Sequence, residues 1–523
     1  MSLEALWSHA IREAAASLGW PALPDGELLE PPGDLAHGDC TSNIAMRMAR
    51  ELEQPPRTLA EALAGALDID ATVAGPGFLN LRADRDYFES LVRRILDEGS
   101  QFGRSVVGDN QRVLIEFVSA NPTGPLTVAH ARQAVVGDVL CNCFEFTGHD
   151  VCREYYVNDG GRQIRLLGES VYARYRNEPL PEEGYKGAYI ADLAAQIRDA
   201  QGDRFDAMER DTAVAELGRW AGATLMAGIE RDLADFHVRY DVYTRESQVQ
   251  ADGLVRALLD DWKETAFERD GAMWVTLDGE DKVLVKSSGE LAYRTTDIAY
   301  HREKFRRGFE RLVTLIGPDH HDHVPKMRAA LKLLGFDGFV GLIVQHCRLF
   351  RGAEEVKMST RGGTYVTLRE VMEEVGVDAA RYCFAMRGPS TKLDFDLELA
   401  KRQTKDNPVF YSQYAAVRVA GILRKAPVEE GERAPLGDPE VELARRLRLF
   451  ERTVLKAVER LDPSVLHQFL TDVAGAWQRY YEQVKVLCDD PAERRMRLAV
   501  SRAVRQVVAN ALRLLGVSTP ERM

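Results

Sequence analysis

The chain of 523 residues is too long for a single ordinary domain and has the length of about three or four. Its hydrophobic fraction of 45% is typical of a globular protein, and it lacks an apolar run of about 18 residues, so no membrane-spanning helix is expected. The net charge of −13 argues against a general nucleic-acid binder, although residues 441–523 carry 15 Lys and Arg against 10 Asp and Glu.

The N-terminus and the cysteines indicate the compartment. The first residues open acidic, without the basic segment and apolar core of a signal peptide. The seven cysteines are scattered, and Cys141 and Cys143 have no second pair at zinc-binding spacing. We therefore expect a cytoplasmic protein with reduced thiols and no zinc site. The excess of Lys and Arg in the C-terminal part has two possible explanations. It could bind a polyanion, or these side chains could lie on the solvated faces of helices.

Taken in chain order, the patterns first predict a small α+β domain and then an α/β domain. Residues 1–105 have helical periodicity over 3–18 and 43–52, and a turn and strand over 74–81. Residues 106–397 alternate strand and helix patterns, which indicates a Rossmann-like, doubly wound parallel sheet. The strand patterns lie at 112–118, 151–157, 273–277, 283–286, 312–317 and 339–344, and a helical insertion is expected at about 180–275.

From residue 398 to residue 523 the chain is nearly all helical in pattern. Segments with a period of about 3.6 residues lie at 407–425, 440–461, 464–487 and 492–515. Short loops containing Pro, Gly or Asp separate them, so this C-terminal part is expected to be an all-α helix bundle.

The stretch from Glu116 to Arg132 carries the clearest functional pattern. It indicates a buried strand, a turn with Pro122 and Gly124, and the start of a helix that carries His130. Small turn residues let a phosphate approach the helix N-terminus, where free N–H groups and the dipole favour anions. A second stretch, 356–363, is a loop whose Lys357 could reach a triphosphate. Loops at the two halves of a doubly wound sheet can clamp one nucleotide.

These two stretches resemble the signatures of class I aminoacyl-tRNA synthetases, in the form used by arginyl-tRNA synthetases. Further segments resemble that family in the same order along the chain, at 38–43, 75–80, 240–247, 293–301, 317–321, 393–396 and 406–415. The resemblance implies an arginine–tRNA ligase that uses ATP with Mg²⁺ to form arginyl-adenylate and transfers arginine to the 3′ end of tRNA(Arg). It implies a monomer that binds no zinc and does not associate with a membrane. It also implies that the enzyme requires tRNA to activate arginine.

The resemblance also implies which residues act on ATP. Catalytic roles fall to His130, Lys357 and Thr127. The residues that would bind ATP are Pro122, Gly124, Thr127, Ala129, His130, Lys357, Met358 and Ser359. Catalysis would depend on positioning and charge stabilisation around the leaving pyrophosphate, without a protein nucleophile.

A guanidinium is a planar, permanently charged fork, so its pocket requires a carboxylate that accepts two N–H donors. Asp297 follows Tyr293 by four residues, on one helical face, and the resemblance assigns this pair to the guanidinium. It further implies arginine contacts from Glu116, Ser119, Asn121, Glu246, Asp319 and His320. Taken singly, Asp297 could be a helix cap, Tyr293 a core residue and Glu116 a paired carboxylate. A metal at His320, His321 and His323 is disfavoured because no Cys or Glu lies at ligand spacing.

The C-terminal bundle is expected to read the anticodon end, and the N-terminal domain is expected to contact the tRNA elbow. The residues assigned to tRNA are Tyr411, Gln413, Tyr414, Arg418, Trp477 and Tyr481. Aromatic residues such as Trp477, Tyr480 and Tyr481 could stack on bases, or they could fill the bundle core at helical spacing.

The signatures depart from the family pattern at three positions. Thr127 and Ala129 stand where the family usually has His and Gly, and Thr360 replaces a lysine. Loss of one transition-state contact can cost about 2–4 kcal/mol if nothing replaces it. Arg132 or Arg361 could supply the missing cation. A non-catalytic or specialised paralogue that binds tRNA or arginine, or a ligase for another amino acid, remains the alternative.

Overall fold

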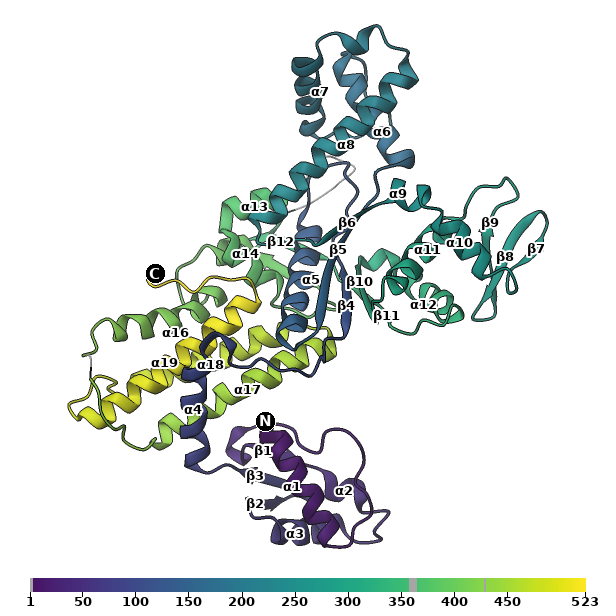
Figure 1. The fold of residues 1–523 in the computed structure, drawn as a ribbon. Coiled ribbons are helices and arrows are strands. Elements are labelled where there is room, and N and C mark those ends of the chain that lie inside the picture. Colours follow the sequence, from purple (N-terminus) through teal and green to yellow (C-terminus); the bar gives the residue numbers. More distant parts are fainter. Residues whose placement is uncertain (1–2, 357–364, 428) are drawn as a thin grey trace.

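The computed structural model describes residues 3–356, 365–427 and 429–523, apart from the side chain of Tyr293 (Figure 1). A central parallel sheet has a helical lobe above it, a small α+β domain below it and a helix bundle to one side. The expected combination of a Rossmann-like sheet, an N-terminal α+β domain and a C-terminal bundle is confirmed. Among the helices of the described chain, none has the length and apolar character that crossing a membrane requires.

The N-terminal domain packs its helices against an antiparallel sheet with the order β1-β3-β2. Its elements are α1 (Leu3–Ser17), η1 (Leu35–His37), β1 (Cys40–Ser42), α2 (Ile44–Met48), α3 (Pro56–Ala66), β2 (Asp70–Ala74) and β3 (Phe78–Arg82). The next helix, α4 (Arg85–Glu98), starts at Asp84, whose carboxylate caps it by accepting from Tyr87 N–H (2.8 Å). This helix leads to η2 (Gly99–Gln101) and the central sheet.

The central sheet has five parallel strands in the order β11-β10-β4-β5-β6. The strands are β4 (Arg112–Glu116), β5 (Asp150–Val157), β6 (Val242–Arg245), β10 (Arg311–Ile316) and β11 (Phe339–Ile343). Val113 and Ile115 pack into the core that contains α5 (Val128–Phe146), whereas Leu114 packs into the core below α11 (Tyr293–Arg306) and α12 (His323–Leu333).

The strand order reverses between β4 and β10. In open parallel sheets, ligands bind at the carboxyl ends of the strands at this point. The ends of β4 and β10 therefore mark the expected site.

Two insertions extend from the sheet. Between β5 and β6, a lobe contains α6 (Gly161–Tyr175), α7 (Ala188–Gln201), η3 (Arg204–Asp206) and α8 (Arg210–Asp235). Helices α6 and α8 approach closely because Gly168 has no side chain; a Cβ there would lie 2.1 Å from Val214 O. Between β6 and β10 come α9 (Glu246–Ala251), α10 (Leu254–Asp261) and a small antiparallel sheet of β7 (Phe267–Arg269), β8 (Ala272–Leu277) and β9 (Glu280–Val285).

Some strands lie elsewhere than the sequence pattern indicated. The patterns at 273–277 and 283–286 form β8 and β9 in the separate antiparallel sheet. Both strands keep exposed side chains, which an antiparallel sheet with one solvated face allows. Strand β6 belongs to the central sheet although it falls within 180–275, where helix was expected. It has only four residues at the sheet edge, so its pattern is weak.

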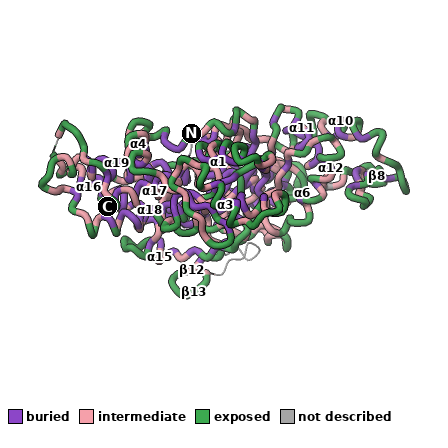
Figure 2. The backbone as a smooth tube through the Cα atoms, turned by 90° about the horizontal axis from the view of Figure 1, so that it is seen from below, coloured by how far each residue is buried: buried purple, intermediate pink, exposed green. Residues whose placement is uncertain are grey.

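The chain after β11 passes through a third small sheet into the bundle. The elements before the bundle are η4 (Pro318–His320), which follows β10, and β12 (Cys347–Arg351), β13 (Glu354–Glu355), α13 (Leu368–Val375), α14 (Val377–Phe384), β14 (Leu393–Asp396) and α15 (Leu397–Ala400). The bundle helices are α16 (Pro408–Leu423), α17 (Asp438–Arg460), α18 (Ser464–Gln483) and α19 (Pro491–Leu514), as the periodicity predicted. Figure 2 shows their buried segments continuing toward the middle of the molecule.

Candidate active site

The loop after β4 adopts a backbone conformation that its residues disfavour. Val118 has φ = 68° and Ser119 has φ = 40°, both in the left-handed region. A β-branched residue there persists only where surrounding structure holds it, and such residues cluster at functional sites. The hydroxyl of Ser119 donates to Glu116 Oε1 (2.9 Å) and accepts from the N–H of Tyr156 (3.1 Å). The loop is therefore the first candidate for the site.

Buried polar side chains brace the same loop. The hydroxyls of Tyr240 and Tyr155 donate to loop carbonyls at 3.0 and 2.9 Å. Lys304 of α11 is fully buried and forms an ion pair with Glu116 Oε2. Both oxygens of Glu116 are thus engaged within the protein, so this carboxylate contributes to the site by fixing Ser119.

Thr127 and His130 face each other in the first turn of α5. The N–H of Thr127 donates to His130 Nδ1 (3.1 Å), and the Thr127 hydroxyl lies 3.2 Å from the same nitrogen. Because Nδ1 accepts, the neutral ring carries its hydrogen on Nε2. Burial lowers the pKa of His130 to about 4. His130 is therefore neutral near pH 7 and can donate through Nε2.

The turn before α5 is packed against the helical lobe. Pro122 is buried, and the hydroxyl of Tyr189 in α7 donates to Thr123 O (2.7 Å). A Cβ on Gly124 would lie 3.2 Å from that hydroxyl, so the turn requires a small residue there. Ala129 is exposed in the first turn of α5, where its methyl group faces outward.

The second signature residues Lys357, Met358 and Ser359 lie outside the described residues. The chain that follows them returns to the first signature. The N–H of Leu368 donates to Leu126 O (2.8 Å), and Thr367 forms an antiparallel bridge with Thr127. The two strands that precede Lys357, β12 and β13, belong to the small sheet with β14.

Arg132 does not supply a cation to the site. Its side chain is fully buried, and its two terminal nitrogens donate to backbone carbonyls at 2.7–3.4 Å. These carbonyls belong to Gln345, His346, Arg387, Gly388 and Thr391. The suggestion that Arg132 supplies the cation missing at Thr360 is wrong, because these donors fasten α5 to the segments around β12 and β14.

Asp297 is held in place by two histidines. Its carboxylate oxygens lie 3.0 Å from His301 Nδ1 and 2.5 Å from His323 Nε2. His301 Nε2 in turn lies 3.1 Å from the Thr314 hydroxyl of β10. Burial acts to raise the pKa of Asp297, but His301 and His323 hold it well below its ordinary value. The carboxylate is therefore ionised at neutral pH, and 31% of its side chain is exposed.

Two further carboxylates, Glu246 and Asp159, lie within electrostatic reach of each other, and Glu246 also lies within reach of Asp297. Glu246 begins α9 directly after β6, and burial and the charges of Asp159 and Asp297 raise its pKa. Asp159 follows β5 and accepts from the N–H (3.0 Å) and the hydroxyl (2.8 Å) of Ser247. Like charges placed together favour a bound cation. Sequence reasoning missed Asp159, since a single Asp after a strand forms no motif.

The remaining residues assigned to the amino acid lie at the same edge of the sheet. Asn121 Nδ2 donates to Gln163 Oε1 (2.6 Å), which links the loop to α6. Asp319 and His320 are exposed in η4, directly after β10. Tyr293 opens α11, one turn before Asp297. Over the described ranges, no three His, Cys, Asp or Glu side chains form a metal-binding group.

A groove on the bundle combines aromatic and basic side chains. Tyr414, Arg418 and Tyr481 line this groove of about 610 Å³ beside α16 and the end of α18. The Arg418 guanidinium lies 4.7 Å from the centre of the Tyr481 ring. Lys425 and Lys485 line it as well. Stacking surfaces next to cations suit an unstacked nucleobase and its phosphate.

Other residues assigned to tRNA belong to the interior of the bundle. Trp477 and Gln413 are buried, and Tyr411 packs against the same core. Gln413 Nε2 donates to Asp378 and to Ser518 O, both at 2.9 Å. Trp477 and Gln413 are therefore not available for tRNA on the surface, which corrects the assignment of these two residues.

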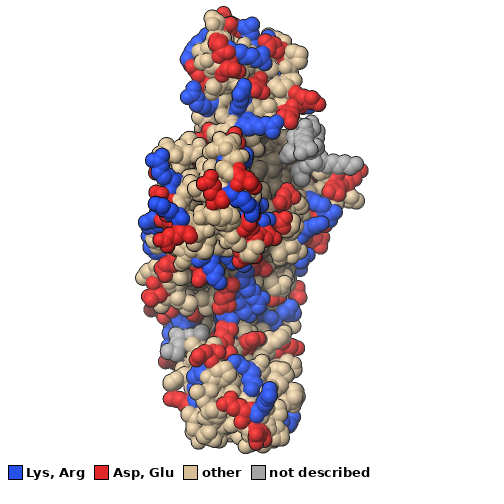
Figure 3. Space-filling model, turned by 90° about the vertical axis from the view of Figure 1, so that its right-hand side faces the viewer, with Lys and Arg blue, Asp and Glu red and all other residues tan. Residues whose placement is uncertain are grey.

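The basic excess of the C-terminal part is largely used inside the molecule. Three arginines on α17 form ion pairs with carboxylates of the N-terminal domain. The pairs are Arg445–Asp39, Arg448–Glu4 and Arg452–Glu27. Lys and Arg side chains are intermixed with Asp and Glu over the face seen in Figure 3.

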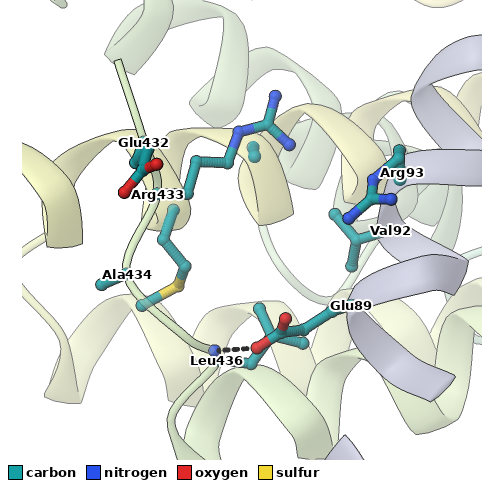
Figure 4. A pocket seen from close by; sticks show the side chains of 9 residues that line it. Glu89, Val92, Arg93, Glu432, Arg433, Ala434 and Leu436 are labelled. Carbon is teal, nitrogen blue, oxygen red and sulfur yellow. Dashed lines mark hydrogen bonds between the residues drawn. The ribbon is translucent and has the colours of Figure 1, made fainter. Parts of the chain in front are cut away.

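A separate hollow of about 450 Å³ lies between α4 and the bundle (Figure 4). Glu89 of α4 accepts there from the N–H of Leu436 (3.0 Å). Arg93 and Arg433 also line it. Its walls come from α4, α19 and the segment 432–436, so it is not part of the site at the strand ends.

The strand order, the helix that carries His130 and the contacts of Thr367 and Leu368 with the first signature are those of a class I aminoacyl-tRNA synthetase. The family model of the class I (R) catalytic domain matches residues 91–387. Residues 5–83 match the arginyl-tRNA synthetase N-terminal domain, and residues 412–523 match the DALR anticodon-binding domain. The chain belongs to the arginyl-tRNA synthetase family, as its sequence motifs indicated.

Individual relatives agree with this assignment. The chain is 43% identical to arginine–tRNA ligase from Geobacillus kaustophilus, and the match covers 98% of each chain. It is 42% identical to the same-named protein of Nitratidesulfovibrio vulgaris, again over 98% of each. The solved Thermus thermophilus arginyl-tRNA synthetase shares its fold with a TM-score of 0.81, at 23% identity and full coverage of both chains.

Proposed function

We propose that this arginine–tRNA ligase activates L-arginine with ATP at the carboxyl ends of β4 and β10 and transfers it to tRNA(Arg). Membership of the whole chain in the family supports the reaction. The observation that carries the choice of arginine is the ionised carboxylate of Asp297 near Glu246, which in turn lies near Asp159. Such a group complements a guanidinium better than a neutral side chain.

Activation requires that charge be stabilised while pyrophosphate leaves. A carboxylate oxygen of arginine attacks the α-phosphorus of ATP, and the bond to the β-phosphate oxygen breaks. His130 would donate from Nε2 to a phosphate oxygen, and the N-terminus of α5 would face the same negative charge. Lys357 would stabilise the negative charge of the leaving pyrophosphate. Mg²⁺ would arrive bound to ATP.

The altered first signature fits this scheme. Thr127 would act through His130, because its N–H and hydroxyl both lie at Nδ1 and keep the ring neutral with Nε2 free to donate. Ala129 adds a methyl group at an exposed position of the helix start, where no described side chain needs to move. One correctly oriented histidine would then do the work that the family assigns to two.

The amino acid would lie between the loop after β4 and α11. Tyr293 and Asp297 would hold the guanidinium, with Glu246 nearby, and Asn121 and the loop fixed by Glu116 and Ser119 would face the α-amino end. Asp319 and His320 would border the pocket from β10. The exposed position of these two residues leaves room for a substrate at the strand end.

The tRNA would be bound at both ends of the molecule. The groove lined by Tyr414, Arg418 and Tyr481 would hold bases of the anticodon loop, with Tyr411 behind it, and the N-terminal domain would contact the elbow. In the second step, a ribose hydroxyl at the 3′ end attacks the carbonyl carbon of arginyl-adenylate, and AMP leaves. The family resemblance supports a monomer that acts in the cytoplasm.

The decisive experiment is aminoacylation of total tRNA by the purified protein with ATP, Mg²⁺ and labelled amino acids. We expect charging with arginine and none with lysine or glutamate, and pyrophosphate exchange only in the presence of tRNA. Charging with another amino acid would refute the assignment of Asp297. Complete absence of arginyl-tRNA, with tRNA still bound, would establish the non-catalytic alternative.

A further inference from the structure

A second pocket, separate from the substrate site, lies between the small β7–β9 sheet and helices α11 and α12. It has a volume of about 290 Å³, near the lower end of the range of about 300–1,000 Å³ for small-molecule sites. Its apolar walls include Leu277, Leu284, Ile298 and Met327. Figure 1 shows β8 and β9 beside these two helices, to the right of the central sheet.

Hydrogen bonds hold the walls of this pocket together without a ligand. The N–H of Ala292 and the hydroxyl of Thr295 donate to Leu284 O at 2.9 and 2.7 Å. Strand β9 is thereby fixed to the first turn of α11. Leu284 and Ile298 are also buried in the core shared by the small sheet, α11 and α12. The pocket is thus formed in advance, which reduces the ordering cost of binding.

The pocket also carries unbalanced positive charge. Lys282, Arg294 and Lys326 line it, each only partly exposed, and no carboxylate does. Lys282 pairs with Glu280 at 2.5 Å. The charge of Lys326 also acts on Glu280, whereas Arg294 has no hydrogen bond or ion pair with another residue in the described part of the chain. Partly desolvated cations that outnumber the nearby carboxylate favour an anion.

We propose that this pocket binds a small organic anion, that is, a carboxylate, sulfonate or phosphate attached to an apolar body. The apolar body would occupy the space against Leu277, Leu284 and Met327, and Arg294 and Lys326 would pair with the anionic group. Charge and shape thus exclude arginine itself, because its guanidinium would face two cations.

The occupant would influence arginine binding through His323. This residue lines the pocket, and its Nε2 lies 2.5 Å from the Asp297 carboxylate. A ligand that moves the imidazole would alter the position and the charge environment of Asp297. This step depends on the proposed role of Asp297 in holding the guanidinium. Coupled sites typically change each other's affinity by about five-fold or more.

The binding test uses the full-length chain and 1-anilinonaphthalene-8-sulfonate, whose fluorescence rises in an apolar site. Arg294→Glu combined with Lys326→Glu should weaken its affinity at least ten-fold. The matched control is Arg328→Glu with Lys332→Glu, two exposed residues of α12 outside the pocket, which should bind like the unchanged protein. If both double variants lost affinity for the probe to the same extent, or if neither lost affinity, the proposal would be overturned.

A filling variant covers the case in which charge reversal prevents folding. Val283→Trp would occupy the pocket without a change in charge, and its circular dichroism and melting temperature establish whether it folds. It should lose the fluorescent probe as well, and unchanged binding would contradict the proposed location. Phenylacetate and phenyl phosphate should displace the probe at lower concentrations than neutral benzyl alcohol does. Displacement at equal concentrations would refute the preference for an anion.

The coupling to arginine is tested separately. At a saturating concentration of the probe, the KM for arginine should change about five-fold and the KM for ATP should stay the same. An unchanged arginine KM would refute the coupling and leave the binding site standing. Since probe binding is measured without substrates, failure of the proposed ligase activity would not affect that first result.

Discussion

The arrangement around His130 explains at the residue scale how the first signature can work with a single histidine. In solution, neutral imidazole can place its hydrogen on either nitrogen. Here Nδ1 accepts from Thr127 N–H, which leaves the hydrogen on Nε2. A residue at position 127 thus matters for the orientation of the ring even if it never touches ATP.

The protonation of His130 gives a direct prediction. Burial lowers its pKa to about 4, from 6.5 in the unfolded chain. As the pH falls from 6.5 toward 4, the unfolded state takes up a proton that the folded state does not, so this group lowers stability with falling pH. Each pKa unit of difference between the folded and unfolded states corresponds to about 1.4 kcal/mol of folding free energy. We expect a histidine signal that titrates near pH 4 in NMR.

His467 must be distinguished from His130 in that measurement. Its pKa is also lowered to about 4, by burial and then by the charge of Arg387. His130→Gln should remove one of the two signals expected near pH 4 and reduce the loss of stability between pH 6.5 and 4. A His130 signal that titrates near 6.5 would show that the ring is solvated and would remove the argument for its fixed tautomer.

The carboxylate of Asp297 is the second residue-scale test. Asp297→Ala should raise the KM for arginine about 10- to 100-fold, because a charge-assisted hydrogen bond contributes about 1.5–3 kcal/mol. The KM for ATP should change little. The control is Asp322→Ala, an exposed carboxylate whose ion pair is with His321; both constants should stay the same. Equal effects of Asp297→Ala on both substrates would refute its role at the guanidinium.

At the element scale, α5 depends on Arg132 for its attachment. This residue is one turn beyond Thr127, and it donates to carbonyls from two separate segments. Each buried carbonyl left without a donor costs about 1–3 kcal/mol. Arg132→Met should therefore lower the free energy of unfolding of the central sheet and its helices by more than about 3 kcal/mol. The stability of Arg132→Lys should lie between that of this variant and that of the unchanged protein.

Thermal unfolding followed by circular dichroism measures this effect. The control is Arg231→Met, an exposed residue of α8, which should shift the melting temperature little. If Arg132→Met melted like the control, the carbonyls would have found other donors, and Arg132 would again be a candidate for contact with ATP.

Local periodicity explains which elements the sequence could predict. Helices α16 to α19 have long apolar faces with a period of about 3.6 residues, so each could be read from its own segment. Strand β6 could not, because four residues at a sheet edge, none of them fully buried, give almost no pattern. Strands β8 and β9 were recognised as strands, but their partners depend on the whole fold.

The residues of the candidate active site show the same limit of prediction from local sequence. Motif residues such as His130 and Asp297 could be identified because their neighbours in sequence carry the pattern. The ion pair of Glu116 with Lys304 joins residues 188 positions apart, and nothing local to either one indicates it. The same holds for the proximity of Asp159 to Glu246, which becomes visible only when β5 and β6 are placed side by side.

At the scale of the whole molecule, α17 connects the two ends of the chain. Arg445, Arg448 and Arg452 recur at helical spacing and face the N-terminal domain. Arg448 is the most buried of them, with 3% of its side chain exposed, and it also donates to Asp39 O. Such a pair is screened by salt less than a surface pair. The position of the N-terminal domain therefore depends on the bundle.

Replacement of Arg448 tests this dependence. Arg448→Met leaves Glu4, with 16% of its side chain exposed, without its partner. Breaking a buried ion pair from one side typically costs about 3–5 kcal/mol. The N-terminal domain should then detach more often, so hydrogen exchange in α1 and β1 should become faster while the central sheet stays protected. If this domain contacts the tRNA elbow, the KM for tRNA should rise more than the KM for arginine.

Arg446→Met is the matched control, because Arg446 lies on the same helix but pairs only with Glu442 of α17 itself. A partly exposed pair within one helix contributes only about 0.3–0.5 kcal/mol and does not touch the N-terminal domain, so exchange in α1 should not change. A further change, Glu4→Gln in the Arg448→Met background, removes the unpaired charge and should restore part of the protection. Exchange in α1 that is the same in all three variants would mean that apolar contacts alone hold the domain, and that α17 does not set its position.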